Sequence, residues 1–338
     1  MKNLSIVIQG PFFCDGILQQ SLIDNLAITR SSYPLSEIII STWAVKPDLI
    51  RQLESAVKEW DVRLVYSPDP GTISFDDGDA KLKSNINRMI VSSLAGISEA
   101  RNSIVIKIRS DSCLINDDAI QLIEKHLQQD DNLKREEGYS IFDRRVINCN
   151  LFARDARGYL PYLFHPGDIM LIGYKQDLLR LFDIDLANSD LFKICASKFF
   201  FSVMNFAPEQ YIWVNCIKEK TGRMVFSGNA ERTSELVSDS ERYYVSNYIP
   251  YTAEQLGFEW SKHKDVYASK GLHSIYRYSD WLKLYNLYLF GVKIPLSASD
   301  RVHVLITQMM KGYFYIRTSL LKIPYVRHMA IKLFSKRC

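Results

Sequence analysis

A basic, an acidic and two hydroxyl side chains follow one apolar stretch of the sequence. Ile104 to Ile108 is a mostly β-branched run typical of a buried strand, and Arg109-Ser110-Asp111-Ser112 comes directly after it. Ligands of open α/β sheets bind beyond the carboxyl ends of strands, so this segment is a candidate site. Asp111 could ligate Mg²⁺ or Mn²⁺ through oxygen, and Arg109 could bind a phosphate directly. The alternative is that Asp111 only caps the following turn.

Two further acids stand where elements are expected to begin. Glu209 follows Pro208 at the start of a predicted helix, and Asp168 lies at the beginning of a strand predicted over 165–174. A carboxylate at either place could accept the proton of an attacking hydroxyl, which accelerates a reaction roughly 100- to 10,000-fold. The structural alternatives are that Glu209 stabilises the helix dipole and that Asp168 is hydrogen-bonded in a turn.

Strand and helix patterns alternate over the first two thirds of the chain. Buried strands are predicted over 4–9, 37–42, 62–66, 104–108, 145–151 and 165–174, and helices over 20–31, 47–60, 86–98, 117–126, 174–182 and 208–220. The Gly- and Asp-rich segment 72–79 predicts a mobile loop. Strands that alternate with helices predict an α/β fold with a mostly parallel sheet flanked by helices.

The pattern changes after residue 230, which divides a predicted catalytic domain (1–230) from a C-terminal region (231–338). The polar, tyrosine-rich part after Arg232 predicts irregular strands or loops, and residues 272–338 predict a helical extension. After Asp300 the chain has eight basic residues and no acid, interleaved with apolar residues. Such cationic amphipathic segments fit an anionic membrane surface, although a helical hairpin packed on the domain is the alternative.

Composition excludes several classes of protein. With 338 residues and 47% hydrophobic residues the chain can build a full core, and a net charge of +4 without an aromatic-basic stripe argues against nucleic-acid binding. Six cysteines without metal-type spacing indicate free thiols, and no apolar stretch approaches the roughly 20 residues that span a bilayer. These features predict a cytoplasmic protein. His263 and His273 could touch a metal or a diphosphate, but a lone surface histidine is the commoner outcome.

Several motifs stand together in the order that is typical of one bacterial family: Ile6-Val7-Ile8-Gln9-Gly10-Pro11, Ile39-Ile40-Ser41-Thr42-Trp43, Ser67-Pro68-Asp69-Pro70-Gly71, Asn85-Ile86-Asn87-Arg88, Lys107-Ile108-Arg109-Ser110-Asp111 and Glu209-Gln210-Tyr211. They resemble the WavE lipopolysaccharide-synthesis family, and the strand before Ser110-Asp111 is similar to the donor half of GT-A glycosyltransferases. The resemblance implies a GT-A-like enzyme that moves a sugar from a nucleotide-sugar to a lipid-linked or oligosaccharide acceptor of lipopolysaccharide core, O-antigen or capsule. Arg109 stands at the first Asp of the Asp-x-Asp motif of those enzymes.

The resemblance also implies roles for individual residues: Gln9, Gly10, Pro11, Thr42 and Trp43 near the nucleotide base, Asp69, Asn85, Asn87 and Arg88 along the nucleoside and sugar, and Arg109 and Asp111 at the diphosphate, where Asp111 would hold Mn²⁺ or Mg²⁺. Inverting members have a general base at the place of Glu209, and Asp168 is the alternative base. The rival functions are a nucleotidyl- or phosphotransferase, disfavoured because no Gly-rich phosphate loop with a lysine is visible, and a non-catalytic scaffold of the assembly complex.

Overall fold

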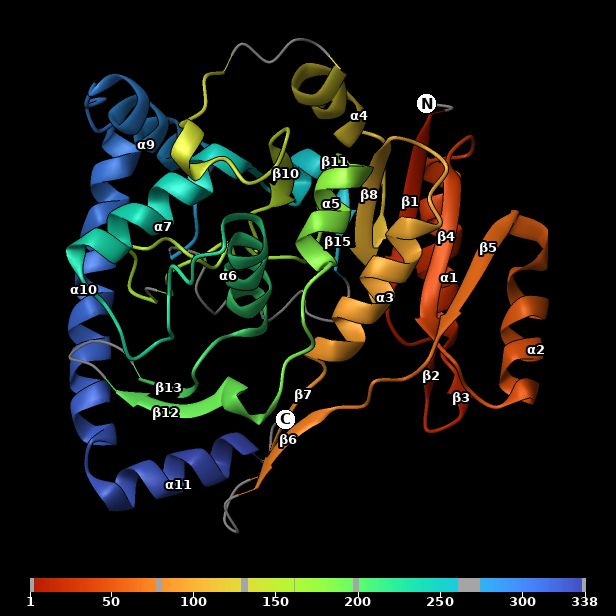
Figure 1. Ribbon diagram of the computed structural model, residues 1–338, viewed down its shortest axis with the longest axis horizontal. Helices are drawn as coiled ribbons and strands as arrows, with labels where there is room; N and C mark the ends of the chain where they lie inside the picture. The colour runs from red at the N-terminus through yellow and green to blue at the C-terminus, as the bar shows by residue number, and fades with distance from the viewer. Residues whose placement is uncertain are drawn as a thin grey trace.

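A seven-stranded sheet forms the centre of the molecule (Figure 1). The computed structural model describes residues 3–76, 81–128, 133–160, 162–196, 201–260 and 274–335. In spatial order the strands are β14 (Tyr248–Tyr251), β10 (Val146–Cys149), β11 (Leu171–Tyr174), β8 (Ile104–Arg109), β1 (Leu4–Gln9), β4 (Glu37–Trp43) and β5 (Val62–Ser67). Only β11 runs against the others. The predicted mostly parallel sheet is therefore confirmed.

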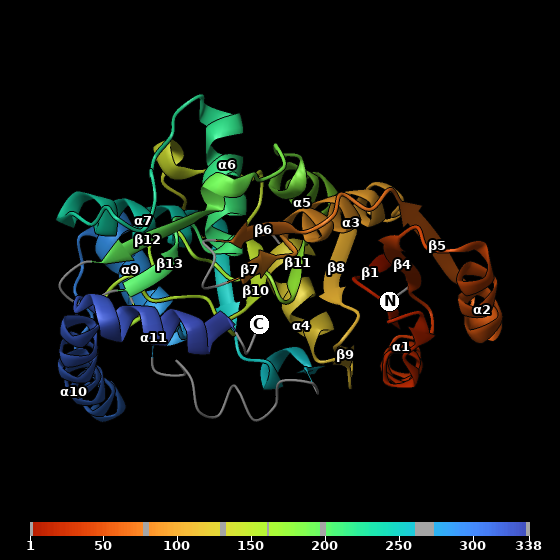
Figure 2. The same cartoon turned by 90° about the horizontal axis from the view of Figure 1, so that it is seen from below.

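Helices cover both faces of this sheet, which explains its apolar strands. The helices of the first 221 residues are α1 (Gln20–Ser32), α2 (Pro47–Val57), α3 (Ile86–Ser98), α4 (Ala119–Ile123), α5 (Lys175–Phe182) and α6 (Pro208–Thr221). Helices α1 and α3 lie on opposite sides of β1 (Figure 2). Helix α3 approaches the sheet at Gly96, where a Cβ atom would lie 2.6 Å from Cγ1 of Val7. Only glycine allows this close contact.

Shorter strands form pairs around the sheet: β2 (Phe13–Cys14) with β3 (Ile17–Leu18), β6 (Ile73–Asp76) with β7 (Lys81–Ser84), β9 (Cys113–Leu114) with β15 (Phe258–Glu259), and β12 (Phe192–Ala196) with β13 (Phe201–Met204). The mobile loop predicted over 72–79 is wrong for its described part, because residues 73–76 form β6. The physical reason is that Phe75 stacks on Phe192, with ring centroids 5.9 Å apart.

The irregular structure predicted after Arg232 is also wrong. Residues 234–247 form helix α7 (Ser234–Asn247), which begins where the Thr233 hydroxyl accepts a hydrogen bond from the Leu236 N–H at 3.2 Å. The tyrosines that obscured its pattern are core residues, and Tyr244 stacks on Tyr276 with centroids 4.3 Å apart. Strand β14 follows α7 and joins the central sheet. The domain division at residue 230 stays a prediction, while the sheet itself extends beyond it.

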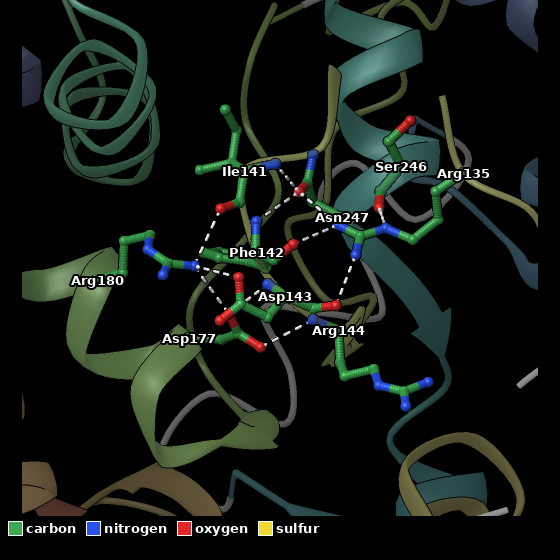
Figure 3. A network of polar contacts seen from close by, with 9 residues as sticks. All are labelled: Arg135, Ile141, Phe142, Asp143, Arg144, Asp177, Arg180, Ser246 and Asn247. Carbon is green, nitrogen blue, oxygen red and sulfur yellow. Dashed lines mark hydrogen bonds and ion pairs between the residues drawn. The ribbon is translucent and has the colours of Figure 1, made fainter. Parts of the chain in front are cut away.

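A polar network holds the loop before β10 against α5 and the end of α7 (Figure 3). The Asn247 side-chain oxygen accepts hydrogen bonds from the N–H groups of Ile141 and Phe142 at 2.8 and 3.1 Å. The Asp177 carboxylate accepts from the N–H groups of Asp143 and Arg144 at 2.6 and 3.0 Å. These bonds satisfy four successive buried or half-buried N–H groups, so the loop has one defined conformation.

Asn247→Ala is expected to lower the free energy of unfolding by about 2–4 kcal/mol, because the two N–H groups and the carbonyl oxygens of Tyr139 and Tyr243 would lose their partner. Urea denaturation measures this effect. Asn286→Ala, at a half-buried asparagine whose bond to a carbonyl is exposed, is the control and should change stability by less than about 1 kcal/mol. Equal effects of both variants would contradict a structural role of the network.

The C-terminal part consists of helices α9 (Tyr278–Phe290), α10 (Ala298–Leu321) and α11 (Pro324–Ser335). Helix α10 begins at a capping box in which Ser297 and Asp300 bond each other's N–H groups. Asp300 also binds the Lys283 ammonium at 2.6 Å and the Arg277 guanidinium at 3.1 Å. No helix among the described residues is long and apolar enough to cross a membrane.

Candidate active site

The predicted site segments meet at the carboxyl ends of β1 and β8. The Ser110 N–H donates to the Gln9 carbonyl at 2.8 Å, and the Ser110 hydroxyl donates to the Pro11 carbonyl at 2.8 Å. Gly10 has a φ of +135°, and a Cβ atom there would lie 2.6 Å from the Ser110 hydroxyl oxygen. Glycine is therefore required for the two strand ends to come together.

Arg109 and Asp111 bind each other at this edge of the sheet. The guanidinium donates to both carboxylate oxygens of Asp111, at 2.8 and 3.0 Å, and stacks on the Trp260 ring with 5.1 Å to its centroid. The described residues contain no group of three or more His, Cys, Asp or Glu side chains that could hold a metal ion. A guanidinium bonded to both Asp111 oxygens does not fit a metal ligand set.

Lys107, two residues before Arg109 in β8, forms a buried ion pair with Asp168. The Lys107 ammonium donates to the Asp168 carbonyl at 2.6 Å and lies 3.3 Å from the Asp168 carboxylate, and neither side chain is exposed. Burial lowers the pKa of Lys107, and the nearby Asp168 carboxylate opposes this shift. Asp168 precedes β11 by three residues instead of opening the strand predicted over 165–174. Its carboxylate is thus committed to a fixed partner.

Glu209 stands in the first turn of α6, close to a buried histidine. The Gln210 side chain fixes this helix end, since it accepts a hydrogen bond from the Ala207 N–H at 2.7 Å and donates to the Leu163 carbonyl at 2.7 Å. A Glu209 carboxylate oxygen lies 3.5 Å from Nε2 of His165, and a fifth of the Glu209 side chain is exposed. Glu209 is therefore positioned by its surroundings and reachable from solvent.

The surroundings of Glu209 suit proton transfer near neutral pH. Burial, together with the negative charge of Asp168, raises the pKa of Glu209 to about 7. Burial and the positive charge of Arg154 lower the pKa of His165 to about 3, so the imidazole is neutral and can donate a hydrogen bond to the carboxylate. Arg109 and Arg154 act in the opposite direction on Glu209 and limit the rise of its pKa.

A second cluster lies between β5 and the start of α3. The Arg88 guanidinium donates to both carboxylate oxygens of Asp69 at 2.7 and 2.6 Å and stacks on the Trp43 ring with 4.9 Å to its centroid. Asn85 accepts a weak bond from Arg88 at 3.4 Å. An aromatic ring beside polar groups suits a nucleoside, which offers a flat base and ribose hydroxyls.

Three of the predicted residues are buried in the structure. Asn87 exchanges two hydrogen bonds with the backbone of Ala187, at 2.9 and 2.8 Å, and ties α3 to the chain after α5. Thr42 is buried within β4. Gln9 is buried as well and accepts a bond from the Ser92 hydroxyl at 3.0 Å. The roles predicted for these residues remain predictions, but the side chains of Asn87 and Gln9 already have structural hydrogen bonds.

Four residues at the site were not among the predicted site residues: Lys107, Arg154, His165 and Trp260. Lys107 carried a signal, because a lone charge inside an apolar strand must find a buried partner. His165 stood in the motif that contains Asp168, whereas Trp260 and Arg154 reach the site only through the fold. His263 and His273 lie outside the described residues.

Solved structures are distantly similar to the chain. A cytidylyltransferase from Leptospira borgpetersenii is 15% identical over 92% of this chain and 97% of its own, with a TM-score of 0.35. Residues 1–349 of S. aureus TarS are 12% identical over 99% and 89%, with a TM-score of 0.34. A mannosyltransferase from Pyrobaculum calidifontis, in complex with GDP-Man and Mn²⁺, is 10% identical over 98% and 86%, with a TM-score of 0.36. No curated protein matches the chain.

A family model gives the decisive comparison. The model described as WavE lipopolysaccharide synthesis matches residues 4–312, a range that includes β1, the Arg109–Asp111 pair, Glu209 and most of α10. This match confirms the resemblance drawn from the motifs and the predicted role in surface-glycan synthesis. The chain belongs to the WavE lipopolysaccharide-synthesis family.

Proposed function

We propose that the protein is an inverting glycosyltransferase, with Glu209 as the general base, which moves a sugar from a nucleotide-sugar to a bacterial surface glycan. The observation that carries this proposal is Glu209 itself. Its carboxylate is held at the head of α6 beside a neutral histidine, is partly exposed, and has a pKa of about 7. A base whose pKa lies near the operating pH is the most effective for general catalysis.

The transfer needs one proton acceptor and one stabilised leaving group. The acceptor hydroxyl oxygen attacks the anomeric carbon, its proton passes to the Glu209 carboxylate, and the bond between the anomeric carbon and the diphosphate oxygen breaks. The nucleoside diphosphate leaves with the bonding electrons and gains negative charge, which the Arg109 guanidinium stabilises. The neighbouring Asp168 carboxylate raises the pKa of Glu209 and so increases its strength as a base.

The second cluster is the proposed nucleoside site. Trp43 supplies an aromatic face, and Asp69 and Asn85 supply acceptors for ribose or base groups around Arg88. The acceptor is a lipid-linked or oligosaccharide precursor of lipopolysaccharide core, O-antigen or capsule, reached at the inner face of the inner membrane from the cytoplasm. Mn²⁺ or Mg²⁺ at Asp111 would require that Arg109 first release the carboxylate.

In a panel of nucleotide-sugars, one class of donor is expected to raise the thermal unfolding temperature of the purified protein, because ligand binding to the folded state raises its stability. Release of the matching nucleoside diphosphate should follow when donor hydrolysis or transfer occurs. The control is Asp69→Ala, which removes an acceptor of the proposed nucleoside site and should weaken this stabilisation. Absence of binding and of turnover with every donor would contradict the proposed glycosyl transfer.

A further inference from the structure

Helix α10 turns an apolar stripe toward solvent. Val302, Leu305, Met309, Tyr313, Ile316 and Leu320 recur every three or four residues, which places them on one side of the helix, and all six are exposed. Met309 is 69% exposed. The outward side of this helix is therefore the apolar one, the reverse of an ordinary surface helix.

The side of α10 that faces the protein is more polar. Thr307 and Thr318 are buried there, and Phe314 stacks on Tyr159 with centroids 5.6 Å apart. The helix is thus anchored by a few contacts, and core formation cannot account for its apolar stripe. More than half of the exposed large apolar side chains of the described residues lie between 302 and 333: Val302, Val304, Leu305, Met309, Tyr313, Tyr315, Ile316, Leu320, Ile323, Tyr325, Met329 and Leu333.

The charge around the stripe has one sign. Residues 301–335 contain Arg301, Lys311, Arg317, Lys322, Arg327 and Lys332 and no acid. The acid just before them, Asp300, is buried and paired with Lys283 and Arg277. A second copy of the chain would bring a like-charged surface to this face, whereas an anionic lipid surface is complementary to it.

The position of α11 agrees with a lipid partner for an enzyme of membrane glycans. Helix α11 runs along the side of the molecule toward which the carboxyl end of β4 points (Figures 1 and 2). The proposed site lies at these carboxyl ends. A membrane at α11 would therefore be on the side of the molecule where an acceptor has to arrive.

We infer that the outward apolar stripe of α10, with the exposed apolar residues of α11, inserts into the interface of an anionic lipid bilayer while the basic residues contact the headgroups. The helices lie on the surface and do not cross it. Delivery of a lipid-linked acceptor by this contact rests on the proposed function; the lipid binding itself does not.

Sedimentation of the full chain with vesicles tests the inference. The protein is expected to bind vesicles of phosphatidylcholine and phosphatidylglycerol in equal parts, to bind pure phosphatidylcholine vesicles more weakly, and to lose affinity as salt is raised. Leu305→Gln/Met309→Gln/Ile316→Gln should weaken binding to the anionic vesicles by more than tenfold. Ile17→Gln/Leu35→Gln/Met224→Gln, at exposed apolar residues outside these helices, is the matched control and should bind as the unaltered chain does.

The charges are tested separately. Arg301→Gln/Lys322→Gln should weaken binding about 25-fold, since each basic residue near an anionic surface contributes about fivefold. Lys58→Gln/Lys220→Gln, two exposed lysines elsewhere, is the control. All variants are compared only if their thermal unfolding matches that of the unaltered chain.

Three results would overturn the inference: no preference for anionic vesicles, unchanged binding by the stripe variant, or a dimer in solution that the stripe variant dissociates. The last result would assign the face to a second copy. The vesicles contain no sugar acceptor, and donor binding is measured on the same preparations. A failure of lipid binding is thus distinguishable from a failure of the proposed glycosyl transfer.

Discussion

Glu209→Gln is expected to lower kcat roughly 100- to 10,000-fold while donor affinity changes little. The amide has the size of the carboxylate but cannot accept the proton of the acceptor hydroxyl, so the loss falls on the chemical step. Glu219→Gln, on the same helix α6 but at its exposed end, is the control and should keep full activity. Initial rates with saturating donor, together with donor titration by calorimetry, measure both quantities.

The pH dependence provides an independent readout of the same residue. The base form of Glu209 is the carboxylate, and its pKa is raised to about 7, so kcat/KM should rise with pH through about 7 and then level off. Glu209→Gln should remove this rise from the residual activity. If Glu209→Gln keeps the full rate and Asp168→Asn does not, the base is Asp168.

Arg109→Gln is expected to weaken the binding of a nucleoside diphosphate about 100-fold, because charge-assisted hydrogen bonds contribute about 1.5–3 kcal/mol each. The substitution also leaves the Asp111 carboxylate without its guanidinium partner, and an unpaired carboxylate repels phosphate. Arg101→Gln, an exposed arginine before the amino end of β8, should bind as the unaltered chain does.

Titration in EDTA and in Mn²⁺ separates the guanidinium from a metal. We expect the affinity of the unaltered chain for the diphosphate to differ by only a few-fold between the two conditions, and the roughly 100-fold loss in Arg109→Gln to be seen in EDTA as well as in Mn²⁺. Binding that requires Mn²⁺ in the unaltered chain and survives in Arg109→Gln would contradict this expectation. Asp111 would then be a metal ligand, as the Asp-x-Asp resemblance implies.

The positions of the central strands could be predicted because burial on both faces gives these strands a mostly apolar sequence. β1, β4 and β8 are buried on both faces, so continuous apolar runs rich in β-branched residues give their positions almost to the residue. Helix α7 could not be predicted in this way, because its buried face combines Tyr243 and Tyr244 with polar residues such as Glu241, which together resemble a surface pattern. Its start at Thr233 was the available signal.

The candidate active site depends on contacts that a sequence pattern does not show. Asn85 and Asn87 belong to one motif, yet residues two apart on a helix face different directions, and only Asn85 lies beside Arg88. The contact between Glu209 and His165 joins segments more than forty residues apart, and the pKa of Glu209 depends on burial that spacing cannot show. The sequence predicted which side chains could act in catalysis or binding. The fold determines which of them are already engaged in structural contacts.

The order of strands in the sheet has a consequence for synthesis of the chain. β14, at residues 248–251, forms the edge beside β10, so a nascent chain that has emerged only to α6 exposes the unpaired backbone of β10. Exposed strand edges invite pairing with other chains. All strands of the central sheet nevertheless precede α10 and α11 in sequence, so they are synthesised before these helices. The chain can therefore complete its sheet before the exposed apolar residues of α10 and α11 are made.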